Sequence, residues 1–304
     1  YYINKQFDIK KILILWGKTL LYSILFFTIF KILGKEASVF QAFFPILAGQ
    51  YWFITAYISL FLIMPVLNLI MNKLTQKQSK YLLIVLLIIY GVIRTIFNPS
   101  DMFNGAFAQM TVVYMLGAYI RKYVTIQPKK QYFIKYVLMA VIITILYVLL
   151  NALTIILPKN EEVLIIIFRT ISLSRDYITI FYVYMTVLIF MKFKTMQIKS
   201  NILSKIITFI SPSVFSIYII HENINIRDTM WLQFGTMNYA NSWVMIPHIL
   251  LSIISVFIIC LLIDLVRRGL YYLIKKIPFV SSTIEKMNML LNKCNTRVNT
   301  FLSE

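Results

Sequence analysis

The segment Trp243–Val266, WVMIPHILLSIISVFIICLLIDLV, decides the fold class of this chain. Asp264 is its only charged residue, and the apolar run around it is unbroken. An α-helix needs about 20 mostly apolar residues to cross the hydrocarbon core of a bilayer. Strands of a membrane barrel instead alternate apolar and polar residues over segments of about ten. The segment is therefore predicted to be a transmembrane helix.

Seven further segments have the same character and predict spans of their own: Ile12–Leu33, Gln50–Met71, Tyr81–Phe97, Phe103–Ile120, Phe133–Leu157, Tyr177–Met191 and Leu203–Ile220. Polar residues dilute the fourth, and Arg169, Arg175 and Asp176 crowd the start of the sixth. Eight spans in one chain predict an all-α, polytopic transmembrane helix bundle. Without a linker or an internal repeat, we expect one membrane domain over residues 1–271 and a short tail over 272–304.

Composition excludes the common soluble classes. The chain has 304 residues, of which 60% are hydrophobic and 13% charged, and its mean hydropathy is +0.79. A soluble domain carries fewer apolar and about twice as many charged residues, and a disordered chain is less apolar still. Two cysteines are too few for a disulfide scaffold.

A formal net charge of +19 would by itself suggest a nucleic-acid partner. Placed on the predicted spans, however, 22 of the 30 Lys and Arg residues fall on the side that holds both ends of the chain. The positive-inside rule makes that side cytoplasmic. The charge is therefore an orientation signal in a multi-pass plasma-membrane protein, and we expect lipids and no nucleic acid as partners.

The tail is predicted to be amphipathic. Pro278 ends the last span, and Ser282 with Glu285 fits a capping box that starts a new helix. Apolar residues then recur every three or four positions beside basic ones, at Ile284, Met287, Leu291, Cys294, Val298 and Phe301. We expect this helix to lie on the anionic inner leaflet, and a coiled-coil partner is the alternative.

The motifs of soluble enzymes are absent from the sequence. It contains no Walker A motif, no dinucleotide glycine fingerprint, no paired-histidine zinc signature and no Gly-x-Ser-x-Gly elbow. The two histidines and two cysteines lie far apart, which gives a metal site no support. We expect neither a metal nor a bound cofactor.

Polar residues gather most densely after the seventh span, where His221, Glu222, Asn223, Arg227 and Trp231 follow one another. A histidine beside a carboxylate is suited to proton transfer, and an arginine to anion binding. We take His221 and Glu222 as candidate catalytic residues and the other three as candidate substrate-binding residues. A capped helix end with a surface ion pair is an equally good interpretation.

Further candidates for substrate binding lie near other span ends. Trp52 and Tyr57 open the second span, where an aromatic belt is the alternative. Arg94, Arg169 and Arg175 are candidates for binding phosphate, carboxylate or oxyanion charge. Their alternatives are a loop ion pair for Arg175 and snorkelling to water for Arg94.

Four stretches together resemble the integral-membrane acyltransferases of family 3, in the branch that O-acetylates bacterial capsular and exported polysaccharides. They are Tyr51–Asn68; Asn104-Gly105 with Tyr114–Arg121; Ser216–Asn223 with Arg227 and Trp231; and Ile263–Arg268. The resemblance implies an enzyme that moves an acyl group, usually acetyl, from cytoplasmic acyl-CoA to a hydroxyl of a cell-envelope polysaccharide or lipid-linked glycan.

The resemblance also implies ten spans and a signature in the first span, a basic residue ten positions ahead of a catalytic histidine. The first span of this sequence contains no histidine, and its first residue is Tyr1. We therefore expect an N-terminally truncated protein that lacks two spans and is inactive alone. His221 and Glu222 would then position the acceptor or help to move its proton.

Three questions stay open at this point. The candidate residues map to the outer side, whereas CoA is cytoplasmic, so a tunnel, a relay of the acyl group or acceptor binding alone would each fit. A glycolipid transporter or flippase is the alternative function, although it predicts repeats and interrupted helices. A membrane scaffold or sensor would need a soluble output domain, and the tail is too short for one.

Overall fold

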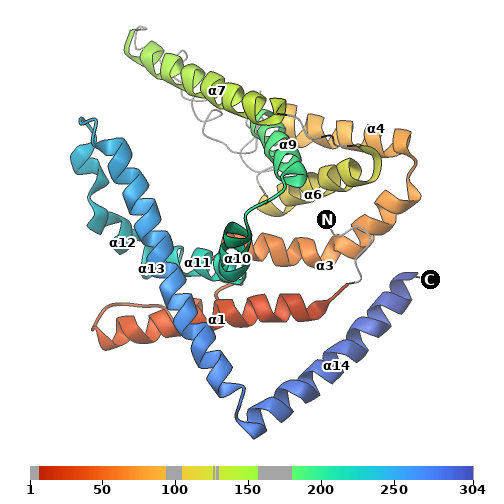
Figure 1. The fold of residues 1–304 in the computed structure, drawn as a ribbon, viewed down its shortest axis with the longest axis vertical. Helices are drawn as coiled ribbons and strands as arrows, with labels where there is room; N and C mark the ends of the chain where they lie inside the picture. The colour runs from red at the N-terminus through yellow and green to blue at the C-terminus, as the bar shows by residue number, and fades with distance from the viewer. Residues whose placement is uncertain (1–6, 94–104, 126, 128–129, 157–179, 304) are drawn as a thin grey trace. The chain divides into compact units, whose positions relative to one another are not determined.

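The computed structural model describes residues 7–93, 105–125, 127, 130–156 and 180–303 (Figure 1). Every regular element among these residues is helical. The elements are α1 (Ile9–Ile32), α2 (Val39–Phe43), α3 (Trp52–Lys73), α4 (Gln76–Leu87), the π-helical η1 (Ile88–Ile93), α6 (Ala106–Tyr123), α7 (Gln131–Ile156), α9 (Ile180–Thr195), α10 (Asn201–Ile210), the 3-10 turn η2 (Ser211–Ser213), α11 (Val214–His221), α12 (Arg227–Phe234), the 3-10 turn η3 (Thr236–Tyr239), α13 (Met245–Ile274) and α14 (Pro278–Ser303).

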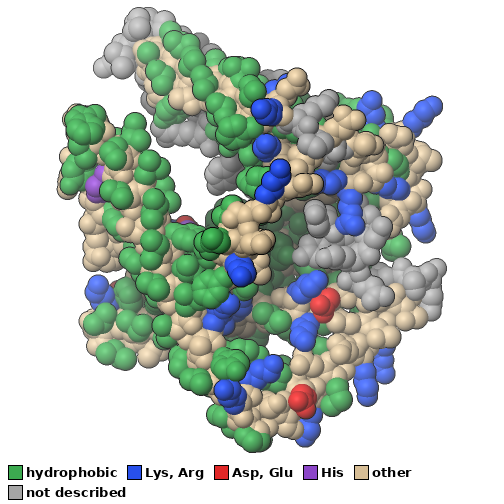
Figure 2. Space-filling model, in the orientation of Figure 1, with side chains coloured by type: hydrophobic (Ala, Val, Ile, Leu, Met, Phe, Trp, Pro, Cys, Tyr) green, Lys and Arg blue, Asp and Glu red, His purple; other side chains and the backbone are tan. Residues whose placement is uncertain are grey.

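Six helical stretches of the described chain are long and apolar enough to cross a membrane. They are Ile9–Ile32, Trp52–Lys73, Gln76–Ile93, Gln131–Leu153, Asn201–His221 and Met245–Ile274. The fourth and sixth predicted spans coincide with α6 and α9, which are not among these six. Large apolar side chains stay exposed along the helices, as lipid-facing surfaces require (Figure 2). The structure thus confirms an all-α polytopic helix bundle.

The chain folds into two compact units. One contains Leu62–Gln197, and the other contains Gln6–Phe61 with Ile198–Glu304. We call them the central unit and the terminal unit. Each is described by itself.

In the central unit, polar contacts fix the turn between α3 and α4. Thr75 and Gln78 form a capping box at the start of α4. The Lys122 ammonium donates to the carbonyl oxygens of Met71 at 2.7 Å and Asn72 at 3.2 Å, which satisfies the end of α3. Further along the same helices, the Tyr114 hydroxyl donates to Asn68 Oδ1 at 2.6 Å.

In the terminal unit, α1, α11, α13 and the start of α3 share one core. Tyr22, Tyr51, Ile54 and Ile219 have no exposed surface there. Helices in lipid gain little from apolar burial alone, because lipid tails are equally apolar, so close packing and interhelical hydrogen bonds hold them together. The buried polar residues of this unit therefore matter more than they would in a soluble protein.

The seventh predicted span is helical but not uniform. The turn η2 separates α10 from α11, because Pro212 has no backbone N–H to donate and its ring disfavours a regular helix. Figure 1 shows that α10 and α11 do not run in one line. At this bend, side chains of α1 and α13 donate hydrogen bonds to backbone carbonyl oxygens.

The predicted start of the tail helix is wrong. Helix α14 begins at Pro278, which suits a first helical position because its missing N–H needs no partner there. Thr283 lies inside the helix, and its hydroxyl donates to the Phe279 carbonyl. Further along α14, Asn295 and Asn299 bond to the backbone of Ile9 and Phe7 at the start of α1. Contact with the inner leaflet stays a prediction.

Candidate active site

The end of α11 presents His221 and Glu222. Helix α11 stops at His221, and Glu222 caps it with a backbone N–H that still donates to the Tyr218 carbonyl. A short turn follows, and α12 begins at Arg227. The charged and polar residues that sequence reasoning grouped together therefore surround one turn between two helices.

His221 is held in one tautomer. Its Nδ1 lies 2.8 Å from the carbonyl oxygen of Ile217, and a carbonyl can only accept, so Nδ1 carries the hydrogen. In the neutral ring, Nε2 then has the lone pair. Nε2 lies 3.7 Å from Glu222 Oε1, and both side chains are 26% exposed. The arrangement leaves a proton acceptor at the surface of the turn with a carboxylate beside it.

Arg227 brings positive charge to the same turn. Its guanidinium lies 3.7 Å from Glu222 Oε2 and 3.1 Å from Asp228 Oδ1. Arg227 Nε donates a hydrogen bond to the Asp228 carboxylate, which raises the pKa of Arg227 above its ordinary value, so the group stays a cation. The side chain of Arg227 is 45% exposed, which leaves it open to a ligand. This matches the predicted role of an anion-binding residue without testing it.

Asn223 supports the turn from within. It is fully buried, and its side-chain oxygen accepts from the Asn225 N–H at 3.0 Å. Its backbone carbonyl accepts from the N–H groups of Ile226 at 2.9 Å and Arg227 at 2.8 Å. These bonds bring Arg227 back towards Glu222. We therefore assign Asn223 a positioning role, whereas sequence reasoning proposed contact with substrate.

Tyr51 and Gln50 complete this buried network. The Asn223 amide nitrogen donates to the Tyr51 hydroxyl at 2.8 Å, and Tyr51 has no exposed surface. The Gln50 amide turns its nitrogen towards the Gln41 carbonyl, and its oxygen accepts from Tyr51 Oη at 3.3 Å, Asn223 Nδ2 at 3.1 Å and the Ile224 N–H at 3.2 Å. Sequence reasoning missed Gln50 as part of the site, and it placed Tyr51 only in the aromatic group that opens the second predicted span.

Aromatic rings pack beside His221 and against one another. Tyr218 meets the His221 ring edge-on at a centroid distance of 5.9 Å. Phe53 packs on Tyr218 at 5.5 Å, and Tyr57 packs on Phe215 at 5.4 Å. We call the rings of Phe53, Tyr57, Phe215 and Tyr218 the aromatic wall. Two predicted binding residues are found here. Tyr57 is part of the wall, and Trp52, which is 48% exposed, borders it because it stands edge-on to Phe53.

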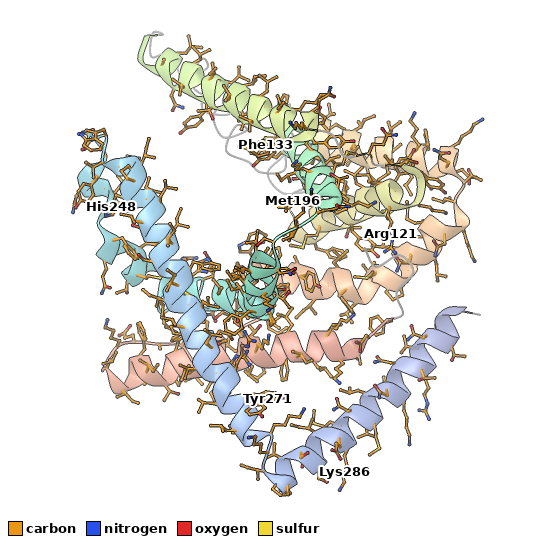
Figure 3. All side chains as sticks on the ribbon, in the orientation of Figure 1. Arg121, Phe133, Met196, His248, Tyr271 and Lys286 are labelled. Atoms are coloured by element: carbon orange, nitrogen blue, oxygen red, sulfur yellow. The ribbon has the colours of Figure 1, made fainter. Side chains whose placement is uncertain are left out.

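The remaining predicted residues lie elsewhere. Trp231 is on α12, is 39% exposed and packs against Phe234. Arg94, Arg169 and Arg175 lie outside the described residues, so their roles stay predictions. His248, labelled in Figure 3, stacks on Tyr239 at 4.4 Å near the start of α13. His221 is thus the histidine that has a carboxylate and an arginine beside it in the part of the chain that is described.

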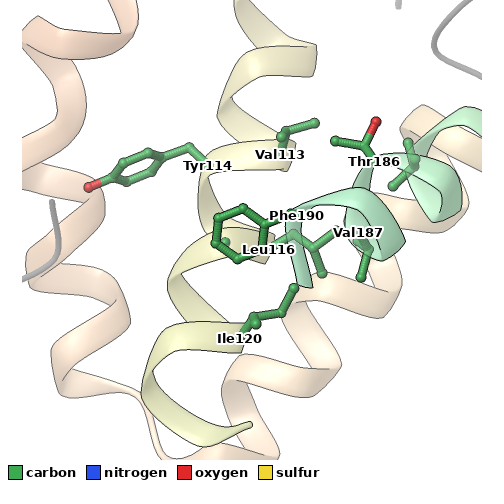
Figure 4. A pocket seen from close by; sticks show the side chains of 9 residues that line it. Val113, Tyr114, Leu116, Ile120, Thr186, Val187 and Phe190 are labelled. Atoms are coloured by element: carbon green, nitrogen blue, oxygen red, sulfur yellow. The ribbon is translucent and has the colours of Figure 1, made fainter. Parts of the chain in front are cut away.

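The described residues show no metal-binding cluster, and a pocket in the central unit is apolar. No group of three His, Cys, Asp or Glu residues in the described chain is arranged to hold a metal ion. A pocket of about 250 Å³ lies in the central unit between α6 and α9 (Figure 4). Its walls are apolar apart from Tyr114 and Thr186, and the Thr186 hydroxyl is bonded to the Tyr182 carbonyl. Such a pocket suits hydrocarbon and offers no acid or base.

Comparison with known protein families gives a match over most of the chain. A family described as "Acyltransferase domain", acyltransferase family 3, matches residues 5–265. No curated protein and no solved structure matches the chain. The matched range includes the whole turn from His221 to Asp228, the network around Tyr51 and α13 as far as Leu265.

Proposed function

The chain belongs to acyltransferase family 3, and from that premise we propose that it O-acetylates a polysaccharide of the bacterial cell envelope. That it is a multi-pass membrane acyltransferase follows from the family and the apolar helices. Acetyl-CoA as donor and a polysaccharide or lipid-linked glycan as acceptor extend the resemblance of Tyr51–Asn68 and Ser216–Asn223. The family match leaves the transporter alternative without support.

One observation carries the proposal to particular residues: His221 Nε2 has its lone pair available beside Glu222 and Arg227. Acyl transfer to a hydroxyl requires a base for the hydroxyl proton and positive charge for the developing oxyanion. The turn between α11 and α12 offers both. The neighbouring Glu222 carboxylate stabilises the imidazolium that forms when Nε2 takes a proton.

Once the acyl thioester has reached this turn through a tunnel in the bundle, the acceptor oxygen forms a bond to the acyl carbonyl carbon while its proton passes to His221 Nε2. The carbon–sulfur bond of the thioester then breaks, and the sulfur takes the proton from the imidazolium and leaves as free thiol. Arg227 stabilises the negative charge that the carbonyl oxygen carries between these steps. No metal or redox partner enters the balance.

The acceptor is proposed to lie along the aromatic wall. Rings of Trp52 and Tyr57 present flat apolar faces, and a tyrosine hydroxyl adds a polar edge. Pyranose rings combine apolar C–H faces with hydroxyl edges, so they fit a surface of this kind. Trp231 on α12 is a further candidate for such contact because its ring is partly exposed.

The test is a pair of histidine variants made in the complete gene, with any sequence upstream of Tyr1 included. We expect His221→Ala to abolish release of acetate from purified polysaccharide after mild alkali, at wild-type protein level in the membrane. His248→Ala is the matched control and should keep acetylation. Wild-type acetylation in His221→Ala would return this residue to a purely structural role.

A further inference from the structure

We propose that Lys18, Arg267 and Arg268 form a binding site for the phosphate groups of a ligand. The three cations come from α1 and α13: Lys18 and Arg268 bond to the bend between α10 and α11, and Arg267 pairs with Asp264 on its own helix. Nothing in the acyl-transfer turn involves them. The site itself stands on these contacts, whereas its assignment to the phosphates of acyl-CoA rests on the proposed function.

The first argument is charge. Lys18 interacts electrostatically with Arg267, Arg268 and Asp264, so the four groups form one cluster of three positive charges and one negative charge. Asp264 is fully buried, and Arg267 Nε lies 2.7 Å from its Oδ1. The Tyr22 hydroxyl donates to the same oxygen at 2.7 Å. Asp264 is thus committed to Arg267, and two cations remain without compensation in the described chain.

The second argument is geometry at the bend. Lys18 Nζ donates to the Pro212 carbonyl at 3.3 Å. Arg268 Nη1 donates to the Phe209 carbonyl at 2.9 Å and to Ser213 Oγ at 3.3 Å. An ammonium has three N–H donors and a guanidinium has five, so both groups keep N–H donors that these contacts do not use. Backbone carbonyls anchor the two side chains but cannot neutralise them.

The third argument is location. Lys18 lies nine residues beyond the start of α1 and Arg268 six residues before the end of α13, which is about 14 Å and 9 Å along each helix. Both helix ends are predicted to be cytoplasmic. Charged groups within a spanning helix are costly and mark ligand or ion sites by default.

The cationic groups of this cluster are suited to binding phosphate. Guanidinium groups bind phosphate oxygens through paired N–H donors, and an ammonium adds a compact charge. A pyrophosphate or phosphate monoester carries two negative charges, which would balance the cluster, and the phosphodiester of a phospholipid headgroup carries one. Two sources supply such a group at a cytoplasmic membrane surface: a soluble thioester of CoA and the headgroup of an anionic phospholipid.

The experiment measures binding rather than transfer, on the full chain in neutral detergent. Inorganic pyrophosphate and CoA are titrated calorimetrically into wild type and the double variant Lys18→Gln, Arg268→Gln. Each lost charge-assisted contact weakens binding about tenfold. Lys205→Gln on α10 is the matched control, because Lys205 is exposed and its substitution removes one positive charge outside the cluster. Its affinity should equal that of wild type.

The outcomes separate the two sources. Weaker binding of both pyrophosphate and CoA in the double variant supports a soluble ligand. If wild type retains phosphatidylglycerol through purification and the double variant does not, while the affinity for pyrophosphate is unchanged, the result supports a lipid headgroup. If the double variant does not fold, Lys18→Gln alone is tested. Unchanged pyrophosphate affinity and lipid retention in a folded variant overturn the site. His221→Ala should leave pyrophosphate binding intact, so failure of the proposed function is seen separately.

Discussion

The side-chain amide of Asn223 donates a hydrogen bond of 2.8 Å to the hydroxyl of Tyr51, and neither residue has any exposed surface. The bond joins the start of α3 to the turn after α11. Because Asn223 also accepts the N–H groups of Asn225, Ile226 and Arg227, the start of α3 determines where Arg227 lies. Tyr51 is accordingly a positioning residue, and it acts through Asn223.

Removing the Tyr51 hydroxyl tests this relation. Tyr51→Phe keeps the ring but leaves Asn223 Nδ2 with only the Gln50 oxygen as acceptor. A buried donor that loses a partner costs about 1 to 3 kcal/mol, so we expect a lower melting temperature in detergent. Acetylation should fall through kcat, since the turn loses its alignment. Tyr271→Phe on exposed α13 surface is the control, and an identical loss there would contradict a specific role.

Arg227 allows function to be separated from stability. Its ion pairs are with exposed or partly exposed carboxylates, and exposed pairs contribute less than about 1 kcal/mol. Arg227→Gln should therefore leave the melting temperature nearly unchanged. If Arg227 holds oxyanion charge, however, kcat should fall about a hundredfold, with partial rescue in Arg227→Lys. A large loss of stability with proportionate loss of activity would instead indicate a structural residue.

Hydropathy predicted the helices well because bilayer thickness imposes one length on every span. Within the described residues, each of the eight predicted spans overlaps a helix or a helical stretch, and six such stretches are long and apolar enough to cross a membrane. The bend at Pro212 and the start of α14 were not predicted correctly. Apolar runs continue through Pro212, so hydropathy cannot detect a change of direction there, and the Ser282–Glu285 motif resembles a helix start while lying inside one.

The site was predictable only where its residues are neighbours in the sequence. His221, Glu222 and Arg227 follow one another closely, and their proximity could be inferred from the polar run itself. Tyr51 stands 172 positions from Asn223, and its aromatic neighbours favoured an interfacial belt. Asp264 and Tyr22 are similarly distant in sequence. Such pairs depend on which helices pack together, and the periodicity of single helices carries no information on that.

Gly49 sets the turn that delivers Gln50 and Tyr51 to the network. Its φ is +68°, in the left-handed region, and a Cβ there would meet no atom within 4 Å. Gly49→Ala is thus a test of backbone strain alone, with an expected cost of about 1 to 2 kcal/mol. Gly49→Asn should cost less, because asparagine tolerates this conformation. The check is thermal unfolding, and Gly269→Ala inside α13 should show no loss of stability.

Cys294 reports the orientation of α14 without any engineered label. It is exposed, whereas the chain's other cysteine, Cys260, is buried. With the predicted cytoplasmic tail, a membrane-impermeant maleimide should label the protein in broken cells and not in intact ones. Cys294→Ser should remove the signal. Labelling of intact cells at the same rate would place the tail outside and reverse the predicted orientation.

Asp264 joins α13 to α1 through one oxygen, which accepts from both Tyr22 and Arg267. Asp264→Asn removes the charge but not the shape, and it leaves Arg267 as a nearly buried cation with no counter-ion in the described chain. Breaking a buried pair in this way costs about 3 to 5 kcal/mol, so the variant should unfold at a markedly lower temperature. Asp228→Asn is the matched control, because Asp228 is 72% exposed and its loss should change stability by less than about 0.5 kcal/mol. Equal melting temperatures for the two variants would show that the buried pair does not hold α1 to α13.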